Sequence, residues 1–272
     1  MKIKDIVIFL SLFFLLIPYF AEAGVSIVGD LTHEKSAKAG ETYSGIIFVR
    51  NTGETQQEVK AYQTDYLFFQ DGSNIYGEPG KDPRSNAKWI TFSPNLMTIP
   101  PKEKAEIQYT IKVPEDKTLT GTYWSMFMVE GIAMGSLESE SAPPKKDEIK
   151  ASIKTVFRYG IQMVTNISDT GVRKLKFMDI KTMKEKDKVN LQIGIENIGE
   201  RLLKPSLYTE LYDDKGNYIG KFNGGQLRTY PGTSVKFNID MTQVPKGKYK
   251  SMIIVDCGGD NLFGMPYDLV IE

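Results

Sequence analysis

The sequence contains one short pattern twice. Gly-x-Tyr-x-Ser-Met occupies residues 121–126 and returns at residues 247–252, 126 positions later. Each copy follows a Val-Pro turn and runs into an apolar stretch. A Gly-x-Tyr that leaves a polar turn and enters a strand is typical of a tyrosine corner, in which the ring fills the core of a β-sandwich and the hydroxyl bonds to backbone near the turn. The repeat therefore predicts an all-β chain that contains the same sandwich twice.

A second pair of matching segments follows the same order. Asn51-Thr-Gly-Glu54 ends one alternating stretch in the first half of the chain, and Asn197-Ile-Gly-Glu200 ends another in the second half. Asn and Gly at these places indicate tight turns. Ser125 and Ser251 stand where antibody domains carry a Cys after the corner Tyr, so we expect no disulfide between the sheets.

Alternation of apolar and polar residues extends the strand prediction to most of the chain. The period is two, as in a half-buried strand, and no stretch has the period of a helix. The clearest alternating segments are residues 42–51, 105–113 and 151–163. We predict an all-β fold with two tandem immunoglobulin-like β-sandwich domains, residues 24–165 and 166–272.

The N-terminus has the pattern of a secretory signal peptide over residues 1–23. Lys2 and Lys4 precede an apolar run from Ile6 to Phe20, and an Ala-x-Ala site ends at Ala23. We expect cleavage there and a mature protein in the periplasm or secreted; the alternative is an uncleaved membrane anchor. No later apolar run is long enough to span a membrane.

Charge and reactive residues argue against several function classes. The 34 basic residues balance 34 acidic ones, so neither nucleic acid nor an anionic membrane is expected as a bulk partner. The single histidine, His33, has no second His for a zinc site and no G-x-S-x-G nucleophile motif. The only cysteine, Cys257, shares the phase of core residues. We predict no enzymatic activity, no catalytic residues, no metal and no cofactor.

The two halves differ by an insertion. Between Asn51 and Pro101 there are 50 positions, whereas 34 positions separate Asn197 from Pro231. The breaker-rich segment 72–88 accounts for the surplus, and we predict that it is an inserted loop. Long loops within compact domains are often functional.

Residues 134–149 form a second irregular segment. They are rich in Ser, Glu, Pro and Lys, which predicts a flexible, solvated loop before the alternating segment 151–163.

The strand that follows the first corner suggests a binding patch. If Tyr123 faces inward, then Trp124, Met126 and Met128 face outward. The corresponding face of the second domain carries Lys248 and Lys250. An exposed face of Trp and Met would suit an adaptable protein contact; alternatively, the 72–88 loop or the second domain covers it.

The inserted loop offers a different candidate. Tyr76, Arg84, Asn86 and Trp89 have the composition of glycan-binding and interface sites. This favours a second hypothesis, a glycan- or peptidoglycan-binding module. The alternative is a self-packed loop in which Arg84 holds a carboxylate such as Asp65 or Asp82.

A family resemblance adds to these observations. The order of short strand, Pro, alternating strand, Val-Pro-x-Asp and apolar strand over residues 89–129 resembles the N-terminal immunoglobulin-like domain of periplasmic pilus-assembly chaperones. Ile153-Lys-Thr-Val-Phe-Arg158 is similar to that family's last strand of domain 1, where a basic residue anchors the client's C-terminal carboxylate. The resemblance implies that Lys154 holds this position, with Arg158 beside it.

The tandem layout also resembles the two-domain extracellular proteins that interact with WxL surface proteins. Together these observations predict a non-enzymatic exported protein that binds another envelope or extracellular protein in assembly or adhesion. Strand addition along residues 151–163 would provide the affinity.

Overall fold

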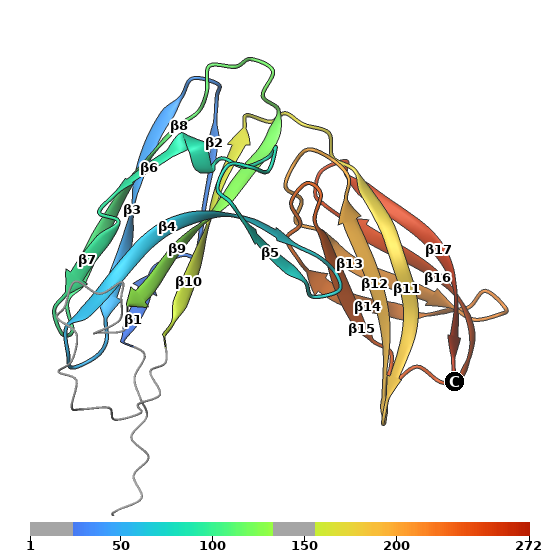
Figure 1. The fold of residues 1–272 in the computed structure, drawn as a ribbon. Helices are drawn as coiled ribbons and strands as arrows, with labels where there is room; N and C mark the ends of the chain where they lie inside the picture. Colours follow the sequence, from blue (N-terminus) through green and yellow to red (C-terminus); the bar gives the residue numbers. More distant parts are fainter. Residues whose placement is uncertain (1–23, 133–155) are drawn as a thin grey trace, which may run out of the picture.

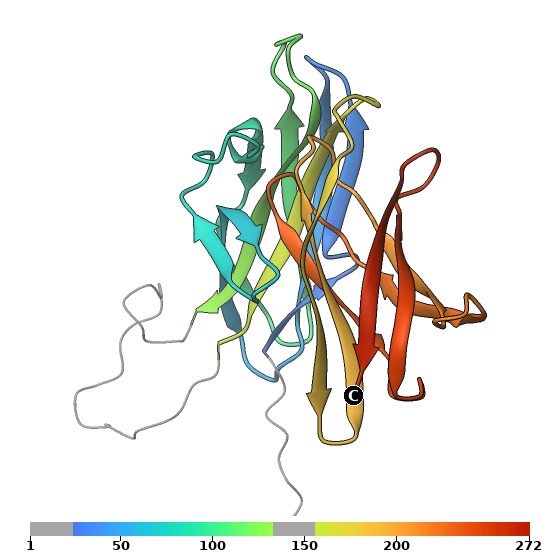
Figure 2. The same cartoon turned by 90° about the vertical axis from the view of Figure 1, so that its right-hand side faces the viewer.

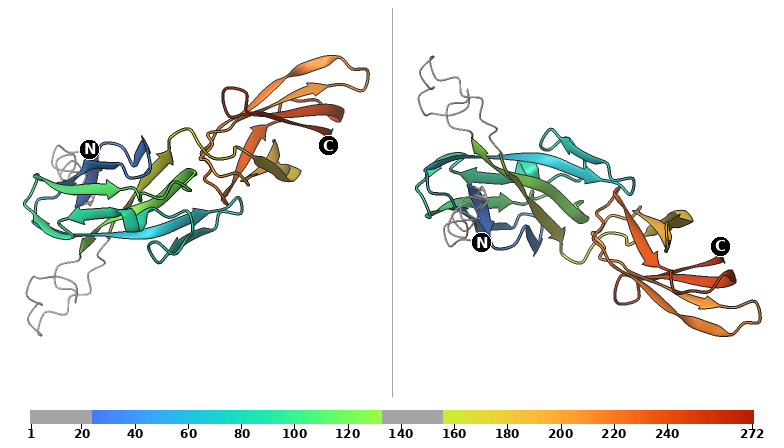
Figure 3. Two further views of the ribbon diagram at one scale, coloured as in Figure 1. Left: turned by 90° about the horizontal axis from the view of Figure 1, so that it is seen from above. Right: turned by 90° about the horizontal axis from the view of Figure 1, so that it is seen from below.

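The computed structural model describes residues 24–132 and 156–272 and confirms the all-β prediction. Two β-sandwiches form the arms of an inverted V (Figure 1), and the views from above and below show the two domains meeting end to end (Figure 3). Within the described residues, the one helical segment is the short 3-10 turn η1 (Ala87–Trp89), and no helix could cross a membrane. The expected signal peptide, the 134–149 segment and Lys154 lie outside these residues.

The first domain pairs two antiparallel sheets, with one parallel pair at an edge. The first sheet has the order β1 (Val25–Val28), β3 (Thr42–Asn51), β8 (Lys104–Lys112) and β6 (Ile90–Ser93). The second has the order β2 (Thr32–Ala37), β10 (Arg158–Ile167), β9 (Gly121–Ile132), β4 (Gln57–Phe68) and β5 (Asn74–Gly77), and β7 (Leu96–Ile99) also pairs with β4. The last strand, β10, thus continues beyond the expected domain boundary at residue 165.

The second domain repeats the arrangement with fewer strands. One sheet has the order β11 (Leu175–Glu185), β12 (Lys188–Asn197) and β15 (Ser234–Asp240). The other has the order β14 (Tyr218–Gln226), β13 (Ser206–Tyr212), β16 (Gly247–Asp256) and β17 (Leu262–Ile271). Figure 2 shows these strands, in orange and red, in front of the first domain.

Each domain has its own apolar core between its sheets. Phe127 and Val129 of β9 are fully buried in the first, and Ile253 and Val255 of β16 are fully buried in the second. These residues follow the two corner sequences at equivalent positions, so the repeat correctly predicts the inward phase of both strands.

The tyrosine corner itself is present in the second domain. Tyr249 donates its hydroxyl to the carbonyl oxygen of Pro245 at 2.7 Å. Tyr123, its counterpart, packs its ring on Trp89, 4.7 Å between centroids, and under the guanidinium of Arg84. Its hydroxyl has no hydrogen-bond partner among residues 24–132 and 156–272, so the corner prediction is wrong for the first domain. The Tyr123 ring is held by packing against Trp89 instead.

The duplicated Asn-x-Gly-Glu turns are equivalent in atomic detail. Asn51 and Asn197 are fully buried. The amide nitrogen of Asn197 donates to the carbonyls of Arg201 (2.8 Å) and Thr229 (3.0 Å), and its oxygen accepts from the Gly199 N–H. Asn51 makes the same type of contacts in the first domain. Each Asn therefore ties its turn to a loop distant in sequence.

The inserted segment 72–88 is not the featureless loop predicted from its breakers. β5 pairs with β4 in a hairpin closed by the Phe69 N–H to Ser73 carbonyl bond. The chain that follows β5 is organised by Asp65, a buried carboxylate that accepts from the backbone N–H groups of Gly80, Lys81 and Asp82. Three backbone N–H groups and the Ser85 hydroxyl, rather than Arg84, satisfy this carboxylate.

Replacement of Asn197 should therefore destabilise the second domain. Asn197→Ala removes the donor to the Arg201 carbonyl, the acceptor of the Gly199 N–H, and one of the two donors to the Thr229 carbonyl, which also accepts from the Leu203 N–H. Each polar group left unsatisfied costs roughly 1–3 kcal/mol. We expect a loss of about 2–4 kcal/mol in the free energy of unfolding, measured by urea denaturation. Asn238→Ala, on the exposed face of β15, is the matched control and should change stability little. Equal effects of the two variants would contradict the anchoring role.

His33 ties β2 across the sandwich. Its Nδ1 lies 2.8 Å from the Tyr109 hydroxyl on β8, and the ring is half-buried. Burial is the main cause that lowers the pKa of His33 below 6.5, against the opposing effect of Asp30. The folded state consequently favours the neutral ring.

A depressed histidine pKa predicts acid sensitivity with a definite sign. Below the unfolded-state pKa of 6.5, the unfolded chain binds a proton that the folded chain binds less readily, so stability falls as the pH drops. Urea midpoints measured between pH 7.5 and about 5 should decrease in the wild type. The decrease should be smaller for His33→Gln, which cannot titrate. A steeper decrease in that variant would refute the assignment.

Candidate partner-binding surface

One stretch of β10 has an open edge. β9 pairs with the whole of β10, whereas β2 pairs in parallel only with Gln162–Ile167. The Gly131 N–H donates to the Phe157 carbonyl, and the Gln162 N–H donates to Leu31 on the opposite side. Because backbone groups alternate in direction along a strand, those of Arg158 and Gly160 point away from β9. No described strand pairs with them.

The open edge is bordered by apolar side chains. Leu31 lies where β2 begins to cover β10, and Val156 and Phe157 precede the strand. All three are exposed, each by more than 40% of its surface. Unpaired backbone groups between exposed apolar residues provide both parts of a strand-binding surface, hydrogen bonds and apolar contact.

Arg158 lies at the start of this edge and is fixed by an ion pair. Its Nε and Nη2 contact the two carboxylate oxygens of Glu130 at 2.9 and 3.0 Å, and the Tyr62 hydroxyl donates to the same carboxylate. The bond from Arg158 is the main cause that lowers the pKa of Glu130. The Arg158 side chain is 57% exposed, although the guanidinium is bound to Glu130.

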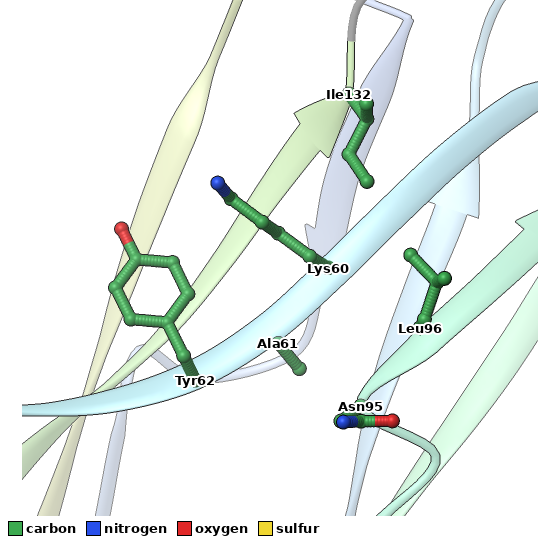
Figure 4. A pocket seen from close by; sticks show the side chains of 6 residues that line it. All are labelled: Lys60, Ala61, Tyr62, Asn95, Leu96 and Ile132. Carbon is green, nitrogen blue, oxygen red and sulfur yellow. The ribbon is translucent and has the colours of Figure 1, made fainter. Parts of the chain in front are cut away.

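A shallow pocket of about 450 Å³ lies beside this ion pair. Figure 4 shows Lys60, Ala61 and Tyr62 on β4, Asn95 and Leu96 at the start of β7, and Ile132 at the end of β9. Tyr62 belongs to both features because its hydroxyl reaches Glu130. The contacts from Tyr62 to Glu130 and from Glu130 to Arg158 therefore connect the pocket with the start of the open edge.

The patch predicted on the outer face of β9 is not at the surface. Trp124, Met126 and Met128 each expose 6% of their surface or less. The Trp124 ring stacks on Tyr230 of the second domain, with centroids 4.8 Å apart, and its Nε1 donates to the Tyr66 carbonyl at 2.8 Å. The expectation of an exposed binding face is corrected: the second domain covers Trp124, as the alternative held.

The residues proposed for glycan binding do not form one exposed set. Asn86 is fully buried, where its amide bonds to Met163, Thr165 and Ser125. Arg84 contacts Glu200 of the second domain at 3.1 Å. Trp89 packs on Tyr123, and only Tyr76 is largely exposed. The hypothesis of a glycan site made of these four residues is therefore corrected.

The β4–β5 hairpin carries the insertion to the second domain (Figure 1). At its tip, the backbone N–H of Gln70 donates to the Ser234 hydroxyl at 3.0 Å, and its side chain reaches Asp179. Phe68 meets Tyr230 edge to face. Sequence reasoning missed Gln70, and a polar residue in a hairpin turn carries no signal of such a contact.

A polar network completes the junction. The Tyr230 hydroxyl donates to Gln162 Oε1 at 2.7 Å, and burial raises the pKa of Tyr230. Arg228 donates to the same oxygen at 3.3 Å and to the Thr32 hydroxyl at 2.9 Å. The Leu202 N–H and the Thr122 hydroxyl add a buried bond. These contacts fix the second domain against β2, β9 and β10.

The comparisons with known proteins find likeness in structure alone. No family model and no curated protein matches the chain. Among solved structures, a chain from the chaperone–tip adhesin complex of CFA/I fimbriae matches at TM-score 0.47 and 13% identity, over 90% of this chain and 98% of that one. The class 5 fimbriae chaperone CfaA matches at 0.43 and 14%, over 91% and 100%. The Acinetobacter baumannii CsuC–CsuE chaperone–tip adhesion subunit complex matches at 0.42 and 14%, over 88% and 97%. Each of these three solved structures contains a chaperone of fimbriae or pili, and a PapD-like domain of human CEP192 also matches, at TM-score 0.33 and 14% identity, over 53% of this chain and 85% of that one.

Truncation of Trp124 should act on stability. Trp124→Ala removes a buried aromatic from the junction, and such changes cost about 3–5 kcal/mol. We expect a lower thermal midpoint and separate unfolding of the two domains, measured by calorimetry. Tyr76→Ala, at an exposed aromatic, should leave the midpoint close to that of the wild type. A Trp124→Ala protein that unfolds like the wild type would contradict the role assigned to the stack.

Proposed function

We propose that this chain is an exported, non-enzymatic protein that binds another envelope or extracellular protein by strand addition and serves a chaperone-like role in assembly. The observation that carries this proposal is the open edge of β10, where Arg158 and Gly160 have no strand partner among the described residues. The signal-peptide pattern and the resemblance of residues 153–158 to pilus-chaperone strands support it.

Among residues 24–132 and 156–272, the edge lacks the devices that usually protect a sheet. Natural edge strands are blunted by proline, by inward-pointing charges or by a covering segment. Over Arg158–Ile161 there is no proline, and the charge of Arg158 is already matched by Glu130. β2 covers the rest of β10 and stops short of this stretch. The unpaired stretch Arg158–Ile161, next to the stretch of β10 that β2 covers, would allow a strand of a partner protein to pair with it.

The junction of the domains would help by holding the edge still. Strand addition gains backbone hydrogen bonds but costs the ordering of both chains. Here β10 is fixed on one side by β9 and near its middle by the second domain through Gln162. The partner would then bear most of the ordering cost.

The backbone role of the edge can be separated from the side-chain role at one position. Arg158→Pro removes the outward N–H and the guanidinium, whereas Arg158→Ala removes only the guanidinium. With a partner first captured by the wild type and then purified, we expect Arg158→Pro to bind at least about tenfold more weakly than Arg158→Ala, because a lost backbone bond costs roughly 1–2 kcal/mol. Affinity is measured by surface plasmon resonance.

Hydrogen exchange supplies an independent measurement. Amides of residues 156–161 should become protected when the partner binds, while those of β17 in the second domain stay unchanged. Equal affinities of the two Arg158 variants, together with unchanged exchange at the edge, would show that the partner binds elsewhere.

A further inference from the structure

A second hollow, of about 210 Å³, lies at the junction of the domains. It lies between β2, the end of β10, the linker that joins β10 to β11 (residues 168–174) and the turn after β12. Its polar lining residues include Glu34, Asn166, Arg173, Arg201 and Lys204. A wider hollow of about 360 Å³ shares Arg201 with it, and its other charged lining residues are Lys38, Glu41 and Asp169. Neither hollow includes the open edge of β10.

Positive charge is in excess at this place, although the chain as a whole is neutral. Arg173 and Arg201 both pair with a single carboxylate, that of Asp169. The Asp169 side chain is 82% exposed, so water screens its attraction. Two guanidinium groups therefore share one weakly held negative charge at the rim of the hollow.

Arg201 is the most constrained of these cations. Its side chain is only 16% exposed, and its Nη1 donates to the carbonyls of Ser168 (2.9 Å) and Thr170 (3.1 Å). Its Nη2 is 3.5 Å from Asp169. Burial, followed by the charge of Arg173, lowers the pKa of Arg201. The fold thus positions a guanidinium where its charge is incompletely compensated, while it keeps donors beyond those used on the linker.

The remaining carboxylate of the hollow is already neutralised. Glu34 accepts from Lys204 Nζ at 2.9 Å and from the Asn166 amide at 3.1 Å, and Arg228 lies 3.8 Å away. Lys204 has three N–H donors and uses one of them on Glu34. Glu34 is thus occupied by other groups, and its attraction for Arg201 is weaker than that of Asp169.

We propose that this hollow is a binding site for a compact oxyanion, of the carboxylate or phosphate type, held by Arg173, Arg201 and Lys204. Planar guanidinium groups match the oxygen spacing of such anions, and a lysine adds a point charge. The linker supplies Arg173, the turn after β12 supplies Arg201 and Lys204, and Glu34 of the first domain steadies Lys204. A bound anion would therefore link the linker to both domains.

Calorimetric titration of the full chain with inorganic phosphate, and separately with acetate, tests the proposal. Ionic strength is kept constant with chloride. We expect saturable binding by the wild type, and at least about tenfold weaker binding by Arg173→Gln and Arg201→Gln, because a charge-assisted bond contributes roughly that factor. The anion that binds more tightly identifies the chemical class.

Arg50→Gln, on the exposed surface of β3, is the matched control and should bind as the wild type does. Arg173→Gln is the safer of the two variants for folding, because within the described part of the chain Arg173 forms its ion pair with the exposed Asp169 alone. Near-ultraviolet circular dichroism checks the fold of this variant. Absence of saturable binding by the wild type, or unchanged affinity in Arg173→Gln, would overturn the proposal.

Discussion

The stack of Trp124 on Tyr230 is the contact on which the shape of the molecule depends. Two aromatic rings from different domains are buried together, and each polar end has a partner, the Tyr66 carbonyl for the indole and Gln162 for the phenol. Buried aromatics with satisfied polar groups add both apolar area and geometric specificity. Because Trp124 and Gln162 are on neighbouring strands, the contact orients the second domain directly against β9 and β10.

Divergence between the two copies is concentrated at this junction. The buried asparagines, Asn51 and Asn197, keep the same role because each turn must be tied to its own domain. Tyr123 lacks the corner hydrogen bond that Tyr249 makes. Its ring instead packs against Arg84, which forms an ion pair with Glu200 of the second domain. The inserted hairpin reaches the same place. The first domain has thus been altered where it meets the second.

The sequence allows the fold and the inward strand phases to be predicted, because both follow from local periodicity. It allows less of the site. A Trp at position 124, on the outer face of β9, indicates that another part of the protein covers that face. The covering residue, Tyr230, lies more than a hundred residues away in the sequence, and no local pattern predicts the contact. Asn86 is a similar case. The residue types around it suit a binding loop, but Asn86 is buried because its side chain bonds to Met163 and Ser125 on other strands. The extent of the open edge depends on the parallel pairing of β2, which alternation does not predict.

The position of β2 connects the domain junction with the open edge of β10. The length of β10 left open is determined by where β2 begins, at Thr32, and Thr32 is held by Arg228 of the second domain. His33, the next residue, is anchored to Tyr109 in the opposite sheet. A slip of β2 toward the start of β10 would cover Gly160 and would break both bonds. The same contacts that fix the angle between the domains therefore also keep the edge accessible, so a partner at the edge and a change at the junction should be energetically coupled.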